Sequence, residues 1–111
     1  MNLNQFGIGD MVAVNKPGYK HVGIYVGPRG FDGSCVVHNR KREGVVLSSL
    51  ADFSGNSQIF ILQKATGNFL EREVIAQRAL SLLGTKYDLF QFNCEHAATT
   101  AQSGIASSPQ S

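Results

Sequence analysis

The chain has 111 residues, a formal charge of +2 at pH 7, and 42% hydrophobic against 16% charged residues. This length suits one domain, and this composition is typical of an ordinary globular protein. The net charge is too small to indicate a nucleic-acid-binding surface. No apolar stretch approaches the ~20 residues that a membrane-spanning helix needs. We expect one domain over residues 1–105, followed by a small, polar, disordered tail at residues 106–111.

Strand-like segments fill the first half of the chain. Residues 11–14 and residues 21–26 (HVGIYV) predict the first two strands. Alternation along the second strand separates His21 from the residues that face the core, and Gly23 leaves an open space beside the histidine. The residues expected to face the core are Val22, Ile24 and Val26.

Three further strands and one helical turn follow. Residues 35–38 (CVVH) and 45–47 predict the third and fourth strands, and residues 48–53 predict the helical turn. Residues 57–63 contain four apolar residues in succession, which predicts an inner strand covered on both faces.

Helical patterns occupy the second half. One helix should begin at the cap Asn68, with Glu71 completing a capping box, and stop at Gly84. A last helix should run over residues 94–102 behind the cap Asn93. We therefore predict an α+β domain, with an antiparallel sheet of about five strands followed by two C-terminal helices. The apolar residues at helical spacing in the first of these helices are Leu70, Val74, Ile75, Ala79, Leu82 and Leu83.

Cys94 is the candidate nucleophile. At the first position of a helix, free N–H groups and the helix dipole lower a thiol pKa, and the same N–H groups can hold an oxyanion. The alternative is a buried, inert thiol. The other cysteine, Cys35, stands three residues before His38 on a predicted strand, so we expect it on the opposite face, as a thiol of the core. A disulfide between Cys35 and Cys94 is compatible with the sequence, although free thiols are favoured.

Histidines supply the candidate base. His21 could take the thiol proton near neutral pH, and His38 on the neighbouring strand could orient it through a ring–ring hydrogen bond. The alternative for both is a strand histidine that faces solvent. His96 follows Cys94 by two residues, which turns it about 200° away on a helix, so we interpret it as structural.

A zinc site is the rival use of the same side chains, namely Cys94, His21, His38 and His96. The sequence has no Cys-x-x-Cys pair and no HExxH helix, so we expect no metal and no cofactor. The basic run at residues 40–42 is interpreted as a solvated loop, with weak contact to anionic lipid headgroups as the alternative.

Several segments together resemble one known family. NCEH at 93–96, reached through GTKYDLFQF at 84–92, is similar to the signature of the lecithin:retinol acyltransferase-like family, within the NlpC/P60 superfamily of papain-like cysteine enzymes. GDMVAVNKPGYKHVGIYVG at 9–27 resembles the family's first two strands, VVH at 36–38 its second histidine motif, and GVVLSSLADFSG at 44–55 the segment that follows.

The resemblance implies a circularly permuted papain-like fold, in which the histidine strands precede the cysteine helix. It implies Cys94 as nucleophile, His21 as general base and His38 as the orienting residue. Members of this family form a thioester and pass the acyl group from a glycerophospholipid to an acceptor or to water. Ala97 departs from the family, which usually has an aromatic residue directly after NCEH.

The expected function is therefore acyl transfer or acyl hydrolysis through a thioester, with a small-molecule or lipid ester as substrate. A cysteine peptidase or amidase, or a non-catalytic binding module on the same fold, is the alternative. We expect a monomer without nucleic-acid partner or integral membrane segment. The N-terminus lacks the features of a signal peptide, and the two cysteines favour a reducing compartment, so a cytoplasmic location is expected.

Overall fold

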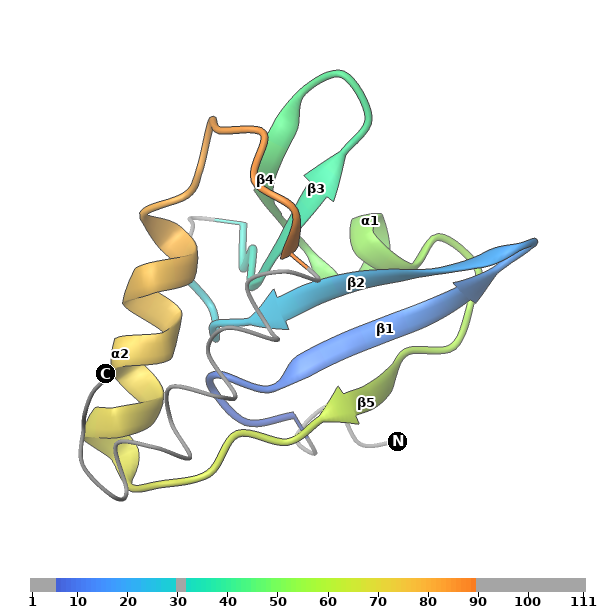
Figure 1. Cartoon of the computed structure of the whole chain (residues 1–111). Helices are drawn as coiled ribbons and strands as arrows, with labels where there is room; N and C mark the ends of the chain where they lie inside the picture. The colour runs from blue at the N-terminus through green and yellow to red at the C-terminus, as the bar shows by residue number, and fades with distance from the viewer. Residues whose placement is uncertain (1–5, 30–31, 90–111) are drawn as a thin grey trace, which may run out of the picture.

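A five-stranded antiparallel sheet with two helices forms the described part of the chain, residues 6–29 and 32–89 of a computed structural model (Figure 1). The strand order is β4-β3-β2-β1-β5. This confirms the predicted α+β class and the sheet. The predicted last helix at 94–102, its cap Asn93 and the tail at 106–111 lie outside the described residues. The elements are β1 (Met11–Lys16), β2 (Tyr19–Tyr25), β3 (Val36–Arg40), β4 (Gly44–Ser48), α1 (Leu50–Ser54), β5 (Phe60–Gln63) and α2 (Phe69–Leu80).

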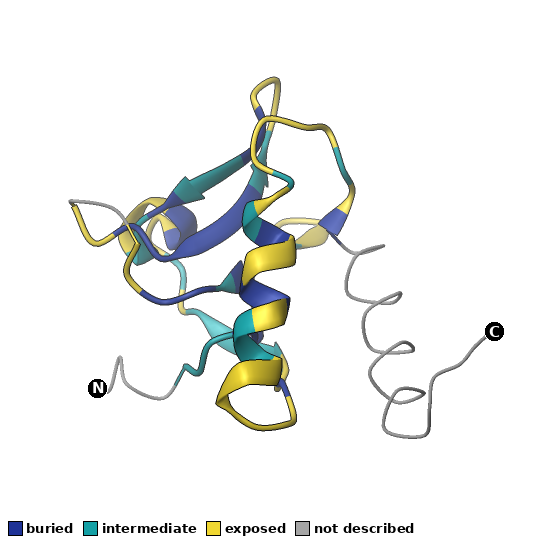
Figure 2. Ribbon diagram, turned by 90° about the vertical axis from the view of Figure 1, so that its left-hand side faces the viewer, coloured by how far each residue is buried: buried dark blue, intermediate teal, exposed yellow. Residues whose placement is uncertain are grey.

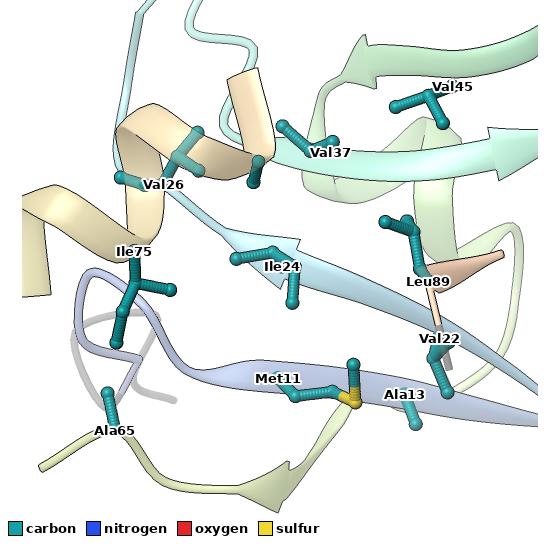
Figure 3. Close-up of a cluster of buried hydrophobic side chains, with 12 residues drawn as sticks. Met11, Ala13, Val22, Ile24, Val26, Val37, Val45, Ala65, Ile75 and Leu89 are labelled. Atoms are coloured by element: carbon teal, nitrogen blue, oxygen red, sulfur yellow. The ribbon is translucent and has the colours of Figure 1, made fainter. Parts of the chain in front are cut away.

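The two faces of the sheet carry separate cores, because side chains alternate along each strand. On β1, Met11 and Ala13 enter one core, whereas Val12 and Val14 enter the other. Helix α2 covers the first core with Ile75, Ala76 and Ala79, and we call it the α2-side core (Figure 3). Helix α1 covers the second with Phe53, and we call it the α1-side core. The core residues predicted for the second strand, namely Val22 and Ile24 of β2 and Val26 directly after it, all lie in the α2-side core.

Strand β5 does not lie where its sequence predicts. Among the described strands it pairs with β1 alone, so it forms an edge of the sheet. Its apolar run still contacts both cores, since Phe60 and Leu62 pack on the α2-side core and the preceding Ile59 on the α1-side core. The predicted inner strand covered on both faces is therefore wrong, because β5 is an edge strand whose residues are half-buried or exposed.

Helix α2 begins as predicted and ends early. The Asn68 side chain accepts from the Glu71 N–H and the Glu71 carboxylate from the Asn68 N–H, which forms the predicted capping box. The helix ends at Leu80, and tighter turns then lead to Gly84 with φ of 88°. Leu70 and Val74, predicted as part of the apolar face, are 70% and 55% exposed. Figure 2 shows this exposed face of α2 in yellow. The side chains of α2 that are buried in the core therefore form a narrower stripe than predicted, namely Ile75, Ala76 and Ala79.

The segment after α2 is hydrogen-bonded to the end of β3 and to the start of β4. The Gly84 N–H donates to the Val45 carbonyl at 2.9 Å, and the Val45 N–H donates to the Thr85 carbonyl at 2.8 Å. The Asn39 side-chain amide donates to the carbonyl of Tyr87. Leu89, the last described residue, is buried in the α2-side core (Figure 3).

Strands β2 and β3 pair over a short stretch only. Gly23 to Tyr25 pair with His38 to Val36, while the first part of β2 pairs with β1 alone. In Figure 1, β3 and β4 rise away from β2 beyond this stretch. His21 precedes this stretch, so it pairs with Val14 of β1 and with no residue of β3.

Candidate active site

The two strand histidines contact each other. Because Gly23 pairs with His38, His21 is the diagonal neighbour of His38 on the same face of the sheet. Nε2 of His21 lies 3.0 Å from Nδ1 of His38, which is hydrogen-bond distance. The expected ring–ring hydrogen bond is therefore present, while the catalytic roles of the two rings stay predictions.

Phe53 of α1 holds both rings from the side of the α1-side core. Its ring stacks on His21 with centroids 5.2 Å apart and planes at 30°, and it meets His38 edge-on with centroids 5.2 Å apart. Gly23 makes room for it, because a Cβ there would lie 3.0 Å from Cε1 of Phe53 and 2.7 Å from Cγ1 of Val36. The space over Gly23, predicted to be open, is therefore filled by Phe53 and Val36.

Ser48 of β4 extends the pair into a row of three side chains. Its Oγ lies 2.8 Å from Nε2 of His38, and Nη2 of Arg40 donates to the same oxygen at 3.4 Å. Ser48 is buried. Sequence reasoning missed this residue, although the pairing of His38 with Val46 places Ser48 on the same face two residues further along β4.

The environment keeps both imidazoles neutral. Burial lowers the pKa of His38 to about 4, and the nearby His21 and Arg40 add to this effect. Burial also lowers the pKa of His21, helped by the positive charges of Lys16 and Arg40. At neutral pH each ring therefore carries one N–H and has one nitrogen lone pair.

The hydrogen bonds can run in either direction along this row. In one direction, His38 donates from Nε2 to Ser48 and accepts at Nδ1 from Nε2–H of His21. His21 then presents the lone pair of Nδ1, which is the atom that a general base needs. In the other direction, Ser48 donates to His38 and Nδ1 of His21 carries the proton.

A cavity of about 240 Å³ opens beside the histidines. Its wall combines the rings of His21, His38, Tyr19 and Phe53 with Asn39. Its charged lining residues in the described ranges are the cations Lys16, Arg40 and Lys41 and the acid Asp52. The cavity is therefore polar and mainly cationic at neutral pH.

Cys35 is a free thiol of the interior, only 4% exposed, as predicted. Burial raises its pKa. Its expected position opposite His38 is wrong, because β3 begins only at Val36 and strict alternation does not extend back to residue 35. Cys35 instead packs in the α1-side core with Val36 and Phe53, and Phe53 is the residue that contacts His38.

The remaining candidate residues, Cys94 and His96, lie outside the described residues. Of the four candidate zinc ligands, the structure thus brings together only His21 and His38. Residues 6–29 and 32–89 contain no group of three or more His, Cys, Asp or Glu side chains suited to a metal ion. Within the same ranges, no helix has the length and apolar character to cross a membrane.

The fold and the bonded histidines agree with the small papain-like domain that the sequence predicts. A family model described as lecithin retinol acyltransferase matches residues 4–107. The match covers nearly the whole chain, and the chain belongs to this family. Membership indicates an acyltransferase-type activity. A comparison with curated protein sequences gave no match.

Proposed function

We propose that this protein transfers acyl groups through a thioester on Cys94, with His21 as general base and His38 as the residue that orients it. The observation that carries the proposal is the 3.0 Å contact between Nε2 of His21 and Nδ1 of His38. A base oriented by a third group is the arrangement that activates a nucleophile in thiol and serine enzymes.

The proposed reaction has two halves. Nδ1 of His21 takes the proton of the Cys94 thiol, and the sulfur attacks the ester carbonyl to form a tetrahedral intermediate. The intermediate collapses to the thioester, and the leaving alcohol takes the proton from His21. An acceptor, or water, then gives its proton to His21 and attacks the thioester, and the second tetrahedral intermediate releases the acyl product while the departing Cys94 sulfur takes the proton back from His21. Neutral imidazole is the form that begins each half, and the lowered pKa of His21 favours that form.

The path of the chain supports the assignment of the nucleophile. Asn39 lines the cavity and also holds the carbonyl of Tyr87, so the segment before Cys94 is tied to the cavity wall. Tyr87 is seven residues before Cys94. Seven residues span at most about 25 Å, which limits how far Cys94 can lie from this part of the cavity wall.

The acyl donor is proposed to be a phospholipid-type ester. The test begins with a short-chain phospholipid and an activated ester, each incubated with the full chain, quenched in acid and analysed by peptide mass spectrometry. We expect the acyl mass on the peptide that contains Cys94. Cys94→Ala should abolish it, and Cys35→Ser should retain it because Cys35 is buried away from solvent.

The histidines are tested in the same experiment. His21→Gln should slow acylation by about 10²–10⁴-fold, the usual contribution of a general base. His38→Gln should slow it less than His38→Ala, since the amide can still bond to His21. An acyl mass on any residue other than Cys94, or none while a known thiol acyltransferase is acylated, would overturn the proposal. Equal acylation rates in wild type and His21→Gln would remove His21 from the mechanism.

A further inference from the structure

Lys16 lies on the same face of the sheet as the histidine pair, and Lys41 lies in the turn that follows β3. In the β1–β2 register, Val14 pairs with His21 and Lys16 pairs with Tyr19, so Lys16 and His21 point to one side. Lys41 follows Arg40 at the end of β3, where the β3–β4 turn begins. Both lysines line the cavity that contains the two histidines.

These lysines are free to bind a ligand, whereas the neighbouring arginine is engaged. Arg40 lies 3.8 Å from the Glu43 carboxylate and donates to Ser48. Lys16 and Lys41 form no ion pair with any residue in the described ranges. Among the described residues, Asp52 is the one acid that lines the cavity, so their side chains carry an excess of positive charge there.

The size and lining of the cavity indicate which part of a substrate it suits. Sites for whole apolar ligands have about 300–1,000 Å³ and mostly hydrophobic walls. This cavity is smaller, at about 240 Å³, and its wall is polar and cationic. It therefore suits a charged group near the reacting ester better than an acyl chain.

We propose that Lys16 and Lys41 bind an anionic group of the acyl substrate, a phosphate or a carboxylate close to the reacting ester, and so select negatively charged esters over neutral ones. This inference rests on the proposed function of the same site. Two ammonium groups that line one cavity favour an anionic group in it, with charge-assisted hydrogen bonds to either or both.

The kinetic test compares esters with one acyl group and different headgroups on the full chain: a neutral glycerol, a zwitterionic phosphocholine, an anionic phosphate and an anionic carboxylate. All are short-chain esters used as dissolved monomers, which removes effects of a membrane surface. We expect wild type to prefer the anionic esters in kcat/KM. The phosphate and carboxylate esters distinguish the two anion sources.

The variants are Lys16→Gln, Lys41→Gln and their combination. Each single change should lower the ratio of anionic to neutral kcat/KM by about three- to tenfold at low salt, mainly through KM. The difference should shrink at 0.5 M salt, because screening acts at these partly exposed positions. Lys20→Gln is the matched control, since Lys20 pairs with Asn15 and points to the opposite face. It should leave the ratio unchanged.

A second measurement needs no turnover. Inorganic phosphate added to the protein should shift the NMR titration of the His21 ring to higher pH, and Lys16→Gln/Lys41→Gln should abolish this shift. Lack of a phosphate effect, or an equal loss for anionic and neutral esters in the lysine variants, would overturn the inference. If neutral esters are still acylated onto Cys94, the proposed function survives that failure. If phosphate binds but no ester acylates Cys94, the proposed function fails by itself.

Discussion

The Oγ of Ser48 lies 2.8 Å from Nε2 of His38, at the end of the ring remote from His21. His38 is thus held at both of its nitrogens. A buried imidazole with two hydrogen-bond partners has a fixed ring orientation, and that orientation is passed on to His21.

Ser48→Ala should reduce activity and stability together. Removing the hydroxyl leaves Nε2 of His38 without its partner in a buried place, which should lower the free energy of unfolding by about 1–3 kcal/mol. Looser orientation of His21 should lower kcat/KM by about tenfold and displace the pH–rate profile. Ser48→Thr, which keeps the hydroxyl, should restore most of both.

The matched control for this change is Ser54→Ala, also a buried serine, whose hydroxyl bonds only to backbone carbonyls of its own helix and cap. It should leave the pH–rate profile in place. If Ser48→Ala and Ser54→Ala behave alike, Ser48 has no positioning role.

Stability should depend on the protonation of His38. The pKa of His38 is about 4 in the folded chain, below its ordinary value of 6.5. Between these values the unfolded state binds more protons, so the free energy of unfolding should fall as the pH falls from about 6.5 to about 4. The contribution is at most about 3 kcal/mol, and the lowered pKa of His21 acts in the same direction.

Urea denaturation at a series of pH values measures this effect. His38→Gln should flatten the curve across that range relative to wild type, because glutamine does not titrate. Parallel curves for the two proteins would show that His38 is not held neutral by the fold.

Gly23→Ala should disturb the histidine pair through Phe53. The added methyl would lie 3.0 Å from Cε1 of Phe53 and 2.7 Å from Cγ1 of Val36, which is too close for either neighbour. Overpacking of this kind costs about 1–3 kcal/mol, and displacing Phe53 should also move His21 and lower activity. In the double variant with Phe53→Leu, the loss of stability should be smaller than the sum of the single losses. Strict additivity, measured by denaturation, would count against this contact.

Asp10 should be among the most sensitive acidic residues in the described part of the chain. Its buried carboxylate accepts from the N–H groups of Gly7 and Ala65 at 2.8 Å each and pairs with Lys64 at 3.1 Å. Asp10→Ala should lower the free energy of unfolding by about 3–5 kcal/mol, because the buried N–H of Ala65, the half-buried N–H of Gly7 and the Lys64 ammonium lose their partner. Lys64→Gln removes only the exposed partner and should lower the free energy of unfolding by about 1 kcal/mol or less. Similar losses for the two variants would contradict this account.

The sequence predicted what is decided locally. Alternation in HVGIYV identified the core face of β2, and Asn68 with Glu71 identified the start of α2. Both depend on neighbours within a few residues of the chain. The facing of His21 and His38 was also predictable, because two adjacent strands carry them.

The sequence did not predict the features that depend on contacts between segments far apart in the chain. Ser48 and Phe53 reach the histidines only through the strand register and the docking of α1, which no local pattern encodes. The edge position of β5 follows from its pairing with β1, about fifty residues earlier in the chain. The exposed Leu70 shows that helical spacing marks a face without fixing how much of it is covered.

Burial of Cys35 has a practical consequence for spectroscopy of this chain. Its raised pKa keeps the sulfur protonated at neutral pH, and the surrounding side chains shield it from bulky maleimides. A fluorophore or spin label offered to the folded, unmutated protein will therefore not attach to Cys35. Unfolding exposes this thiol, so the rate at which Cys35 is labelled measures the rate at which the α1-side core opens.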